Sequence, residues 1–506
     1  MGSKMTTRRL LPCVLVGVIA AMLATSAHVD LAATLHACTA FLRPQDKTKP
    51  LASPSPQVPP VAKSTSSPLV RSPFRISETP TVFPERRPGP AAVAFNPDDN
   101  EYLVVWASDG LTEASGVNDV YGQRISSATN DRIGIAFRIS SMSDGDKYHS
   151  SNDPKVVYNK TAGEYLVVWN GSGQLNSPDN FFEISGQRVS RAGKNIGSPF
   201  QISHNTDLGK VNTNFVRSSS QADVAWNSVN NEYLVIWKGM GEPEDVVKME
   251  IYGQRLKASG EFLGKYFRIS HTTDQGINFH ANAPAIAYDS RDNQYLVVWS
   301  GGFKNESKVE VWGMGVNASG QPVDPKNDLR VSQVTSDLGA DRRASSPHVA
   351  YNSANNEYLV VFQVSTRGEG SGDEIFGQRI DAATLAGQKD FRISNGTGTK
   401  ATRPAVIFNS VAKEYLVLWR NNRQNVPAEI FAKRISLAGT QIQSDFQISN
   451  IESLGKDRTV NIATLTHNSA NGENFVVWQG NGLPGTNTAK VTEIFGQRIA
   501  PPNKSN

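Results

Sequence analysis

Histidine and aspartate recur together in two similar segments, "SHNTDLG" and "SHTTDQG", which place His204 near Asp207 and His271 near Asp274. Imidazole and carboxylate groups are common ligands of divalent metals, and they also bind polar ligands through hydrogen bonds. These pairs and similar residues in neighbouring segments are therefore candidate binding residues. The candidates are His149, His204, Asp207, His271, Asp274, His280 and Asp337.

The same residues have a simpler interpretation, because Asp commonly forms turns and His in a loop is commonly solvated. No compact metal-binding spacing such as HExxH occurs in the sequence, which favours this simpler interpretation. A divalent metal bound by the candidates stays an alternative, and we predict no other cofactor.

The candidate residues lie between the units of a repeat. One pattern of the form EYLVVW recurs at spacings of 57 to 68 residues, which points to a repeat architecture. Each unit has a short strand rich in small residues before this pattern, a GQRI-like strand after it and then a FRIS-like strand. No helical periodicity interrupts the series. The EYLVVW copies end at Trp106, Trp169, Trp237, Trp299, Phe362, Trp419 and Trp478.

Four antiparallel strands repeated seven times predict an all-β fold, a single seven-bladed β-propeller. The last unit ends with "EIFGQRIAPPNKSN" and lacks the FRIS strand, whereas an isolated FRIS at Phe74–Ser77 precedes the first unit. We predict that this N-terminal strand completes the seventh blade by pairing with residues 494–499, because closure removes an exposed sheet edge. An open solenoid is the alternative, and it would need atypical capping units at both ends.

The connections between strands fall into two sets at opposite ends of the predicted blades. Turns after the first and third strands are short and similar, whereas loops after the second strand and links between blades are long and differ in every unit. We call the end with the long connections the variable-loop face. All seven candidate residues belong to it, and variable loops on a rigid scaffold are where binding is expected.

The third strand carries an acidic residue in all seven units and an arginine in six. A catalytic group is needed once and not seven times, so we interpret these charges as structural pairs between strands or blades. The acids are Asp119, Glu183, Glu250, Glu310, Glu374, Glu429 and Glu493, and the arginines are Arg124, Arg188, Arg255, Arg379, Arg434 and Arg498.

The N-terminus predicts export. In residues 1–27, Arg8 and Arg9 precede an apolar run of about 15 residues, and small residues follow it, as in a signal peptide. The run is short for a membrane span, so we expect no transmembrane span after cleavage and a secreted, periplasmic or cell-surface protein. An uncleaved anchor and a lipidated Cys38 stay alternatives. Residues 28–72 form a Pro, Ser and Lys-rich tether, residues 73–500 the propeller and residues 501–506 a tail.

Net charge argues against a nucleic-acid partner. Residues 1–72 hold eight of the 51 Lys and Arg and two of the 47 Asp and Glu, which leaves 43 basic and 45 acidic residues after them. The net charge of +4 therefore comes from the N-terminal segment, and the predicted propeller has no basic excess. We expect a monomer.

With EYLVVW, GQRI and FRIS repeated around a closed ring, residues 73–500 resemble exported bacterial repeat proteins that have this periodic signature. The resemblance implies the fold and export, and it implies no particular activity. No GxSxG, P-loop or dinucleotide fingerprint is present in strand–helix context. We therefore expect a non-catalytic scaffold that binds a protein or a glycan. The alternatives are a propeller hydrolase or lyase acting on polysaccharide, and a structural surface or matrix protein.

Overall fold

All elements of the described chain are β-strands, and they belong to the compact unit formed by residues 67–506. The signal peptide and most of the tether predicted above lie outside the described residues. A computed structural model describes residues 68–77, 88–109, 118–140, 150–172, 182–204, 218–240, 249–271, 280–302, 309–324, 327–334, 342–366, 372–395, 399–423, 427–450, 459–481 and 492–502.

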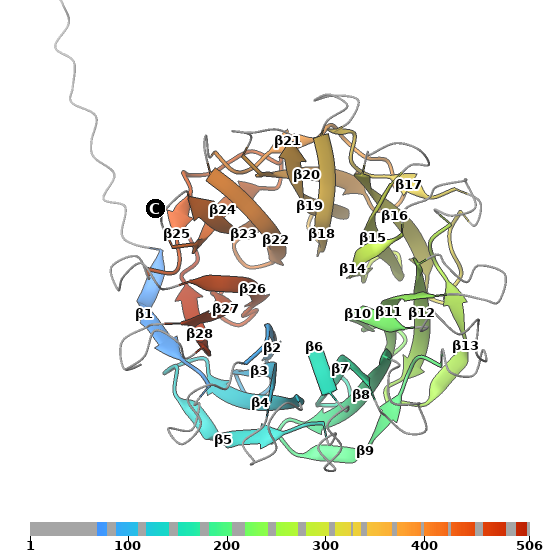
Figure 1. Cartoon of the computed structure of the whole chain (residues 1–506), viewed down its shortest axis with the longest axis vertical. Helices are drawn as coiled ribbons and strands as arrows, with labels where there is room; N and C mark the ends of the chain where they lie inside the picture. The colour runs from blue at the N-terminus through green and yellow to red at the C-terminus, as the bar shows by residue number, and fades with distance from the viewer. Residues whose placement is uncertain are drawn as a thin grey trace, which may run out of the picture. The chain divides into compact units, whose positions relative to one another are not determined.

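The strands form seven antiparallel sheets of four strands, arranged around one axis as the blades of a propeller (Figure 1). From the axis outward, blades one to four are β2 (Ala91–Asn96), β3 (Glu101–Ser108), β4 (Asp119–Ser126) and β5 (Arg132–Arg138); β6 (Ser150–Asn159), β7 (Glu164–Ser172), β8 (Phe182–Ser190) and β9 (Asn195–Gln201); β10 (Ser219–Asn227), β11 (Glu232–Met240), β12 (Met249–Lys257) and β13 (Phe262–Arg268); and β14 (Asn282–Asp289), β15 (Gln294–Gly302), β16 (Val309–Asn317) and β17 (Leu329–Arg330).

Blades five and six continue the same order, and blade seven takes its outer strand from the N-terminus. They are β18 (Arg342–Asn352), β19 (Glu357–Thr366), β20 (Glu374–Asp381) and β21 (Phe391–Arg392); β22 (Thr399–Asn409), β23 (Glu414–Arg423), β24 (Glu429–Ser436) and β25 (Phe446–Gln447); and β26 (Val460–His467), β27 (Asn474–Asn481), β28 (Thr492–Ile499) and β1 (Leu69–Arg75). The predicted seven-bladed fold, closed by the N-terminal strand, is confirmed, and the structure places the small-residue strand innermost and the FRIS strand outermost.

The EYLVVW strand is the most deeply buried strand of a blade, as its apolar residues on both faces predict. In β3, the side chains of Tyr102, Leu103 and Val105 have no exposed surface. The buried clusters join neighbouring blades, so that Trp106 of blade one packs in the same cluster as Phe475 of blade seven. Full burial of one such aliphatic side chain contributes about 1.5–3 kcal/mol, and the ring is therefore held mainly by contacts between blades.

The N-terminal strand closes the ring, and Figure 1 shows β1 beside β28. The backbone N–H of Ile76 donates to the carbonyl of Ile494 at 2.8 Å, and Ser77 donates through its hydroxyl to the carboxylate of Glu493. The ring of Phe74 stacks on Phe475 at a centroid distance of 5.9 Å. The strand begins at Leu69 and is therefore longer than the four residues that the FRIS signal predicted.

The repeated acid of the third strand binds the FRIS strand of its own blade. In blade one the Ser140 hydroxyl donates to Asp119 at 2.8 Å and accepts the backbone N–H of Val120 at 2.8 Å. The guanidinium of Arg138 lies 2.9 Å from the same carboxylate. Equivalent contacts recur in the other blades, so each acid fixes the outer strand to its neighbour, as we predicted for a structural role.

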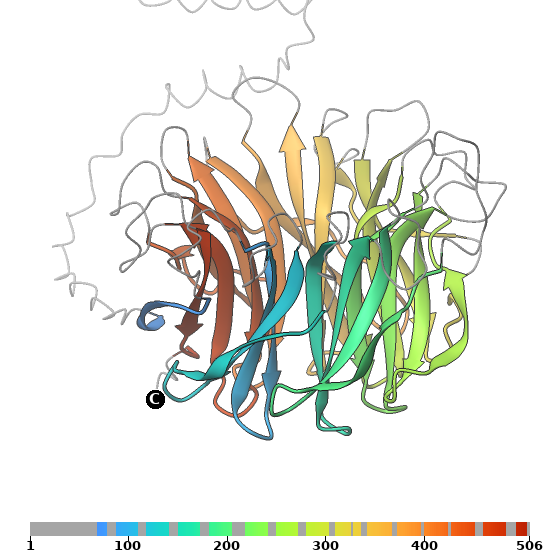
Figure 2. The same ribbon diagram turned by 60° about the horizontal axis from the view of Figure 1, so that its bottom comes forward.

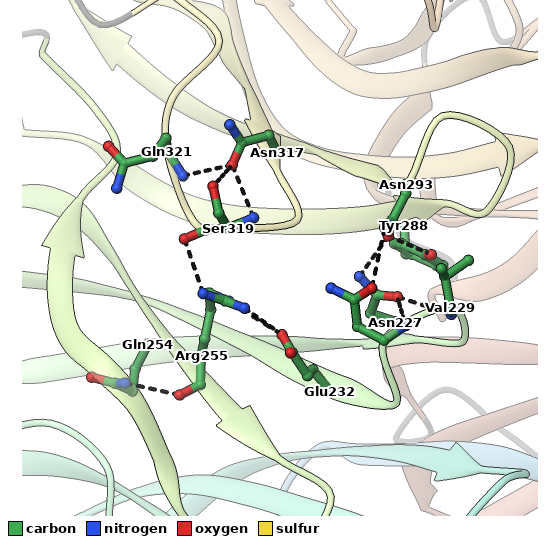
Figure 3. A network of polar contacts seen from close by, with 11 residues as sticks. Asn227, Val229, Glu232, Gln254, Arg255, Tyr288, Asn293, Asn317, Ser319 and Gln321 are labelled. Carbon is green, nitrogen blue, oxygen red and sulfur yellow. Dashed lines mark hydrogen bonds and ion pairs between the residues drawn. The ribbon is translucent and has the colours of Figure 1, made fainter.

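The repeated arginine joins one blade to the next. Figure 3 shows Arg255 of blade three, which donates to Glu232 at 2.7 Å and to the carbonyl of Ser319 in the turn of blade four at 3.0 Å. The same figure shows Asn227 at the end of β10, whose amide donates to Asn293 of the next blade at 2.8 Å. The end of the ring with the short turns is thus held together by polar contacts between blades, whereas the apolar clusters hold the middle.

Blade four replaces both members of the arginine pair. Gln294 stands where the other units have Glu, and Gly315 stands where six units have Arg. Gln294 donates to the carbonyl of Ala382 in blade five at 2.6 Å, and the side chain of Leu385 fills the space beside Gly315. The contact between blades is therefore preserved without the ion pair.

Candidate functional site

The strand ends that flank the long connections all lie at one end of the ring, as the antiparallel topology requires. Figure 2 shows the blades from the side, with their strands running between the two ends. Of the predicted binding residues, His149, Asp207, Asp274 and Asp337 lie outside the described residues. His204, His271 and His280 are described, and they do not lie together.

His204 and His271 follow the outer strands β9 and β13, whereas His280 precedes the inner strand β14. The ring of His204 lies 5.8 Å from that of Phe262, and the backbone N–H of His271 donates to Asp328 at 3.0 Å. His280 accepts the backbone N–H of Met249 at Nδ1 over 3.0 Å, and burial lowers its pKa together with the charge of a nearby lysine. Within the described ranges, no three His, Cys, Asp or Glu side chains gather in a way that could hold a metal ion.

A cavity of about 390 Å³ lies on the axis of the ring, and we call it the central channel. Its lining comes from all seven inner strands, each of which contributes two or three consecutive residues. These residues are Pro90 and Ala91, 153–155, 221–223, 283–285, 346–348, 403–405 and 462–464. The volume falls in the range of small-molecule sites, roughly 300–1,000 Å³.

A β-bulge in the inner strand produces this lining. In blade two the register between β6 and β7 shifts between Asn152 and Lys155, and equivalent shifts occur in blades three to seven. A bulge re-aims side chains locally and is common beside functional sites. Five blades place a non-glycine residue in the left-handed region there, a conformation that costs roughly 1–2 kcal/mol for an L-residue. They are Asp153, Gln221, Ala283, Ser346 and Arg403, with φ of 49–55°.

The residue six places before the Asn or Asp that ends each inner strand differs in every blade. We call these seven channel-lining residues the variable ring: Pro90, Asp153, Gln221, Ala283, Ser346, Arg403 and Ile462. The next residue along the chain is only Ala or Pro in all seven blades. One position of the repeat therefore presents seven different side chains to one cavity, six of them from bulged strands.

Three titratable side chains, Lys155, Asp223 and His348, face the channel from two places further along their strands. The carboxylate of Asp223 accepts the N–H of Val224 at 3.0 Å and that of Ile286 in the next blade at 3.2 Å. Burial raises the pKa of Asp223, and the positive charge of Lys155 opposes this rise. All three side chains are partly exposed to the cavity, although the strands enclose them.

The imidazole of His348 is neutral at pH 7. Its Nδ1 accepts the N–H of Val406 in the next blade at 3.4 Å, which leaves Nε2 as a donor toward the channel side. Burial and the charge of Lys155 lower the pKa of His348 to about 4. Asp223 and His348 thus cap N–H groups on the inner edges of the neighbouring blades.

The sequence prediction did not include Lys155, Asp223 or His348 among its candidates. A signal was present, because five units have a proline at the channel: Pro90 directly precedes its inner strand, and the others lie within theirs, at Pro154, Pro284, Pro347 and Pro404. Proline within a strand pattern indicates an edge or a bulge.

A second cavity of about 340 Å³ lies nearer the short turns, lined by Phe95, Tyr158, Trp226 and His467 among others. The polar groups of Tyr158 and Trp226 are engaged within the fold. Tyr158 donates to Asp98 at 2.5 Å, and the indole N–H of Trp226 donates to Asn231 at 3.3 Å. These contacts explain the aromatic residues as supports of the turns.

Solved structures with this fold match the chain at low sequence identity. A Dyadobacter fermentans protein of unknown function is 13% identical, with coverage of 85% of this chain and 98% of that chain and a TM-score of 0.47. The polysaccharide lyase Uly1 is 9% identical, with 84% and 92% coverage and a TM-score of 0.48. An α-L-arabinanase from Penicillium chrysogenum, complexed with arabinobiose, is 14% identical, with 69% and 93% coverage and a TM-score of 0.40.

These matches establish a likeness of fold alone. No protein-family model matches the chain, and a search of curated proteins finds no match. In the described part of the chain, no helix is long and apolar enough to cross a membrane.

Proposed function

We propose that the protein is an exported, non-catalytic binding scaffold, and that it binds its ligand in the central channel from the variable-loop face. The observation that supports this proposal most is the variable ring, in which one position of the repeat carries seven different residues. A site that hydrogen-bonds an asymmetric ligand needs different groups around it, whereas a purely structural position in a repeat needs the same group each time.

A glycan fits the channel better than a folded protein does. The cavity of about 390 Å³ is too small to admit a protein surface, and it suits the end of a sugar chain. Asp153, Gln221 and Ser346 offer carboxylate, amide and hydroxyl groups of the kind that bind sugar hydroxyls. Export rests on the features of residues 1–27, which resemble a signal peptide.

One observation favours a second candidate, a hydrolase or lyase acting on polysaccharide. Lys155, Asp223 and His348 face one cavity, and the pKa values of Asp223 and His348 are shifted by burial, as is common for acid–base groups. Binding is the better supported function because both oxygens of Asp223 accept backbone N–H groups and Nδ1 of His348 is engaged as well.

The test is a glycan array probed with the full-length protein and two matched variants at Ser346. Ser346→Trp fills the channel at a position that is already in the left-handed region, and Ser346→Ala keeps the backbone and adds no bulk. We expect the wild type and Ser346→Ala to capture the same glycan and Ser346→Trp to lose it.

Capture that survives Ser346→Trp would place the ligand outside the channel and contradict the proposal. A protein that captures no glycan would contradict it as well. If captured polysaccharide is shortened during incubation with the wild type, the enzyme alternative replaces the binding scaffold.

A further inference from the structure

The basic side chains at the channel differ from the repeated arginines of the third strand in their ion pairing. The arginine of the third strand binds a glutamate of its own blade, as Arg124 does with Glu101 at 2.7 Å. Among the described residues, no carboxylate oxygen lies within 4.0 Å of the charged nitrogens of Lys155, Arg403 or Arg420. Lys155 and Arg403 line the channel, and Arg420 lies beside Arg403, so these cations lack the ion pair that their counterparts in the turns have. The channel is also lined by Asp153 and Asp223, from blades two and three.

Arg403 lines the channel on the side of blade six, and Arg420 lies beside it on β23, opposite Thr402 in the sheet. Arg403 belongs to the variable ring, and its guanidinium donates to Asn461 of the next blade at 2.9 Å. Arg420 lies on β23 and donates through Nε to the carbonyl of Val460 at 2.9 Å. Each guanidinium has five N–H donors, so most of them are not used by these contacts.

The two arginines are close enough to repel each other. Burial lowers the pKa of Arg420, and the charge of Arg403 lowers it further. Like charges held together without an anion raise the free energy of the empty site, and an anion that binds between them relieves this cost. Lys238, which follows Trp237 as Arg420 follows Trp419, is also a partly buried lysine whose pKa burial lowers.

Lys155 supplies a cation from blade two, away from the arginines of blade six. Its charge acts on both Asp223 and His348, since it is a cause of the pKa shift of each. Asp223 does not form an ion pair with it within 4.0 Å among the described contacts. Lys155 lines the cavity together with Asp153 and Asp223.

From these contacts we infer that the ligand of the channel is the acidic end of a glycan, a sugar whose carboxylate Arg403 binds, with Arg420 beside it, on the side of the channel opposite Asp153 and Asp223. The inference rests on the proposed binding function. A guanidinium presents a planar fork of donors that matches a carboxylate. Gln221 and Ser346 of the variable ring then contact the sugar hydroxyls. Among the described residues that line the channel there is no Phe, Tyr or Trp, so charge and hydrogen bonds carry the recognition.

The test measures binding of digalacturonate to the full-length protein by calorimetry, with the dimethyl ester of the same disaccharide as its neutral match. We expect the ester to bind about tenfold more weakly or worse, because a charge-assisted bidentate contact is lost. Arg403→Gln should weaken digalacturonate binding by about tenfold and change ester binding little. The control is Arg191→Gln, which removes a half-exposed arginine in a short turn and should change neither.

Four results would overturn the inference. The first is equal binding of the acid and its ester, and the second is unchanged binding in Arg403→Gln. The third is that inorganic sulfate or a short peptide carboxylate binds as tightly as digalacturonate does. This result would show that the site binds anions in general and does not recognise an acidic sugar. The fourth is capture of a neutral glycan alone on the array, lost in Ser346→Trp, which would overturn this inference while leaving the proposed function intact.

Discussion

The N-terminal strand β1 should decide whether the ring is stable. We compare a chain that begins at Ser67 with one that begins at Glu78, since both lack the N-terminal segment and they differ only by the strand and its flanks. Removing β1 leaves the outer edge of β28 without its partner in blade seven. An unpaired edge invites pairing with another chain.

The energetic effect can be worked from the contacts. Ile76 is 1% exposed, and loss of such a side chain costs about 2–5 kcal/mol. Ser77 donates to Glu493, a buried carboxylate, and removal of a donor to a buried polar group costs about 1–3 kcal/mol. The stacking of Phe74 on Phe475 adds to these. The total is on the order of 5 kcal/mol, which is comparable with the whole stability of many domains.

The assay is thermal and urea unfolding followed by intrinsic fluorescence, with size-exclusion chromatography to detect association. We expect the chain from Glu78 to unfold at lower temperature or to associate, and the chain from Ser67 to behave as the full-length protein does. If the shorter chain does not fold at all, Ile76→Ala and Ser77→Ala in the full-length protein should still each reduce stability. Equal unfolding curves for the two chains would refute the closure argument.

Two further predictions concern blade four and the channel. Gly315→Arg alone should lower the free energy of unfolding by about 1–3 kcal/mol in urea, because the new side chain meets Leu385. Adding Gln294→Glu should restore part of this loss, because it supplies the ion-pair partner that the other blades have. If the double variant is no more stable than Gly315→Arg, the explanation of blade four is wrong. The pKa of His348 is lowered to about 4, below the ordinary value near 6.5, so its contribution to stability is present above pH 6.5 and is lost as the pH falls through 4. Between pH 6.5 and 4 the melting temperature of the wild type should therefore fall more than that of His348→Gln. An equal fall in both proteins would contradict this prediction. In an NMR titration, Lys155→Met should raise the pKa of His348, because it removes a nearby positive charge.

The sequence predicted the architecture because each blade repeats its own local signals. The EYLVVW-like and GQRI-like strand patterns recur seven times, so a weak signal in one unit can be interpreted from the other six. The missing FRIS at the C-terminus and the isolated one at Phe74 then predicted closure, and β1 confirms it. The length of β1 was missed because Leu69 and Val70 are separated from Phe74 by a bulge, which interrupts the strand pattern.

The channel was harder to predict because its lining residues come from seven distant segments and the residue type differs from one segment to the next. A search for repeated signals passes over positions such as Gln221 and Arg403, where the absence of repetition is the signal. Their left-handed backbone is also hidden, because the residues that adopt it are not glycine. The prediction therefore turned to His204 and His271, which repeat within the links and lie after outer strands.

Closure by an N-terminal strand also orders the events of synthesis. Ser77 and Glu493 are 416 residues apart in the chain, so their contact cannot form until the last blade has been made. At the usual rates of 5–20 residues per second, β1 waits roughly 20–80 s for its partner. The first strand of the ring to be made is thus the last to pair, and a chain cut short at any point before β28 has no partner for it. Completion of the ring thereby reports that the last blade has been made.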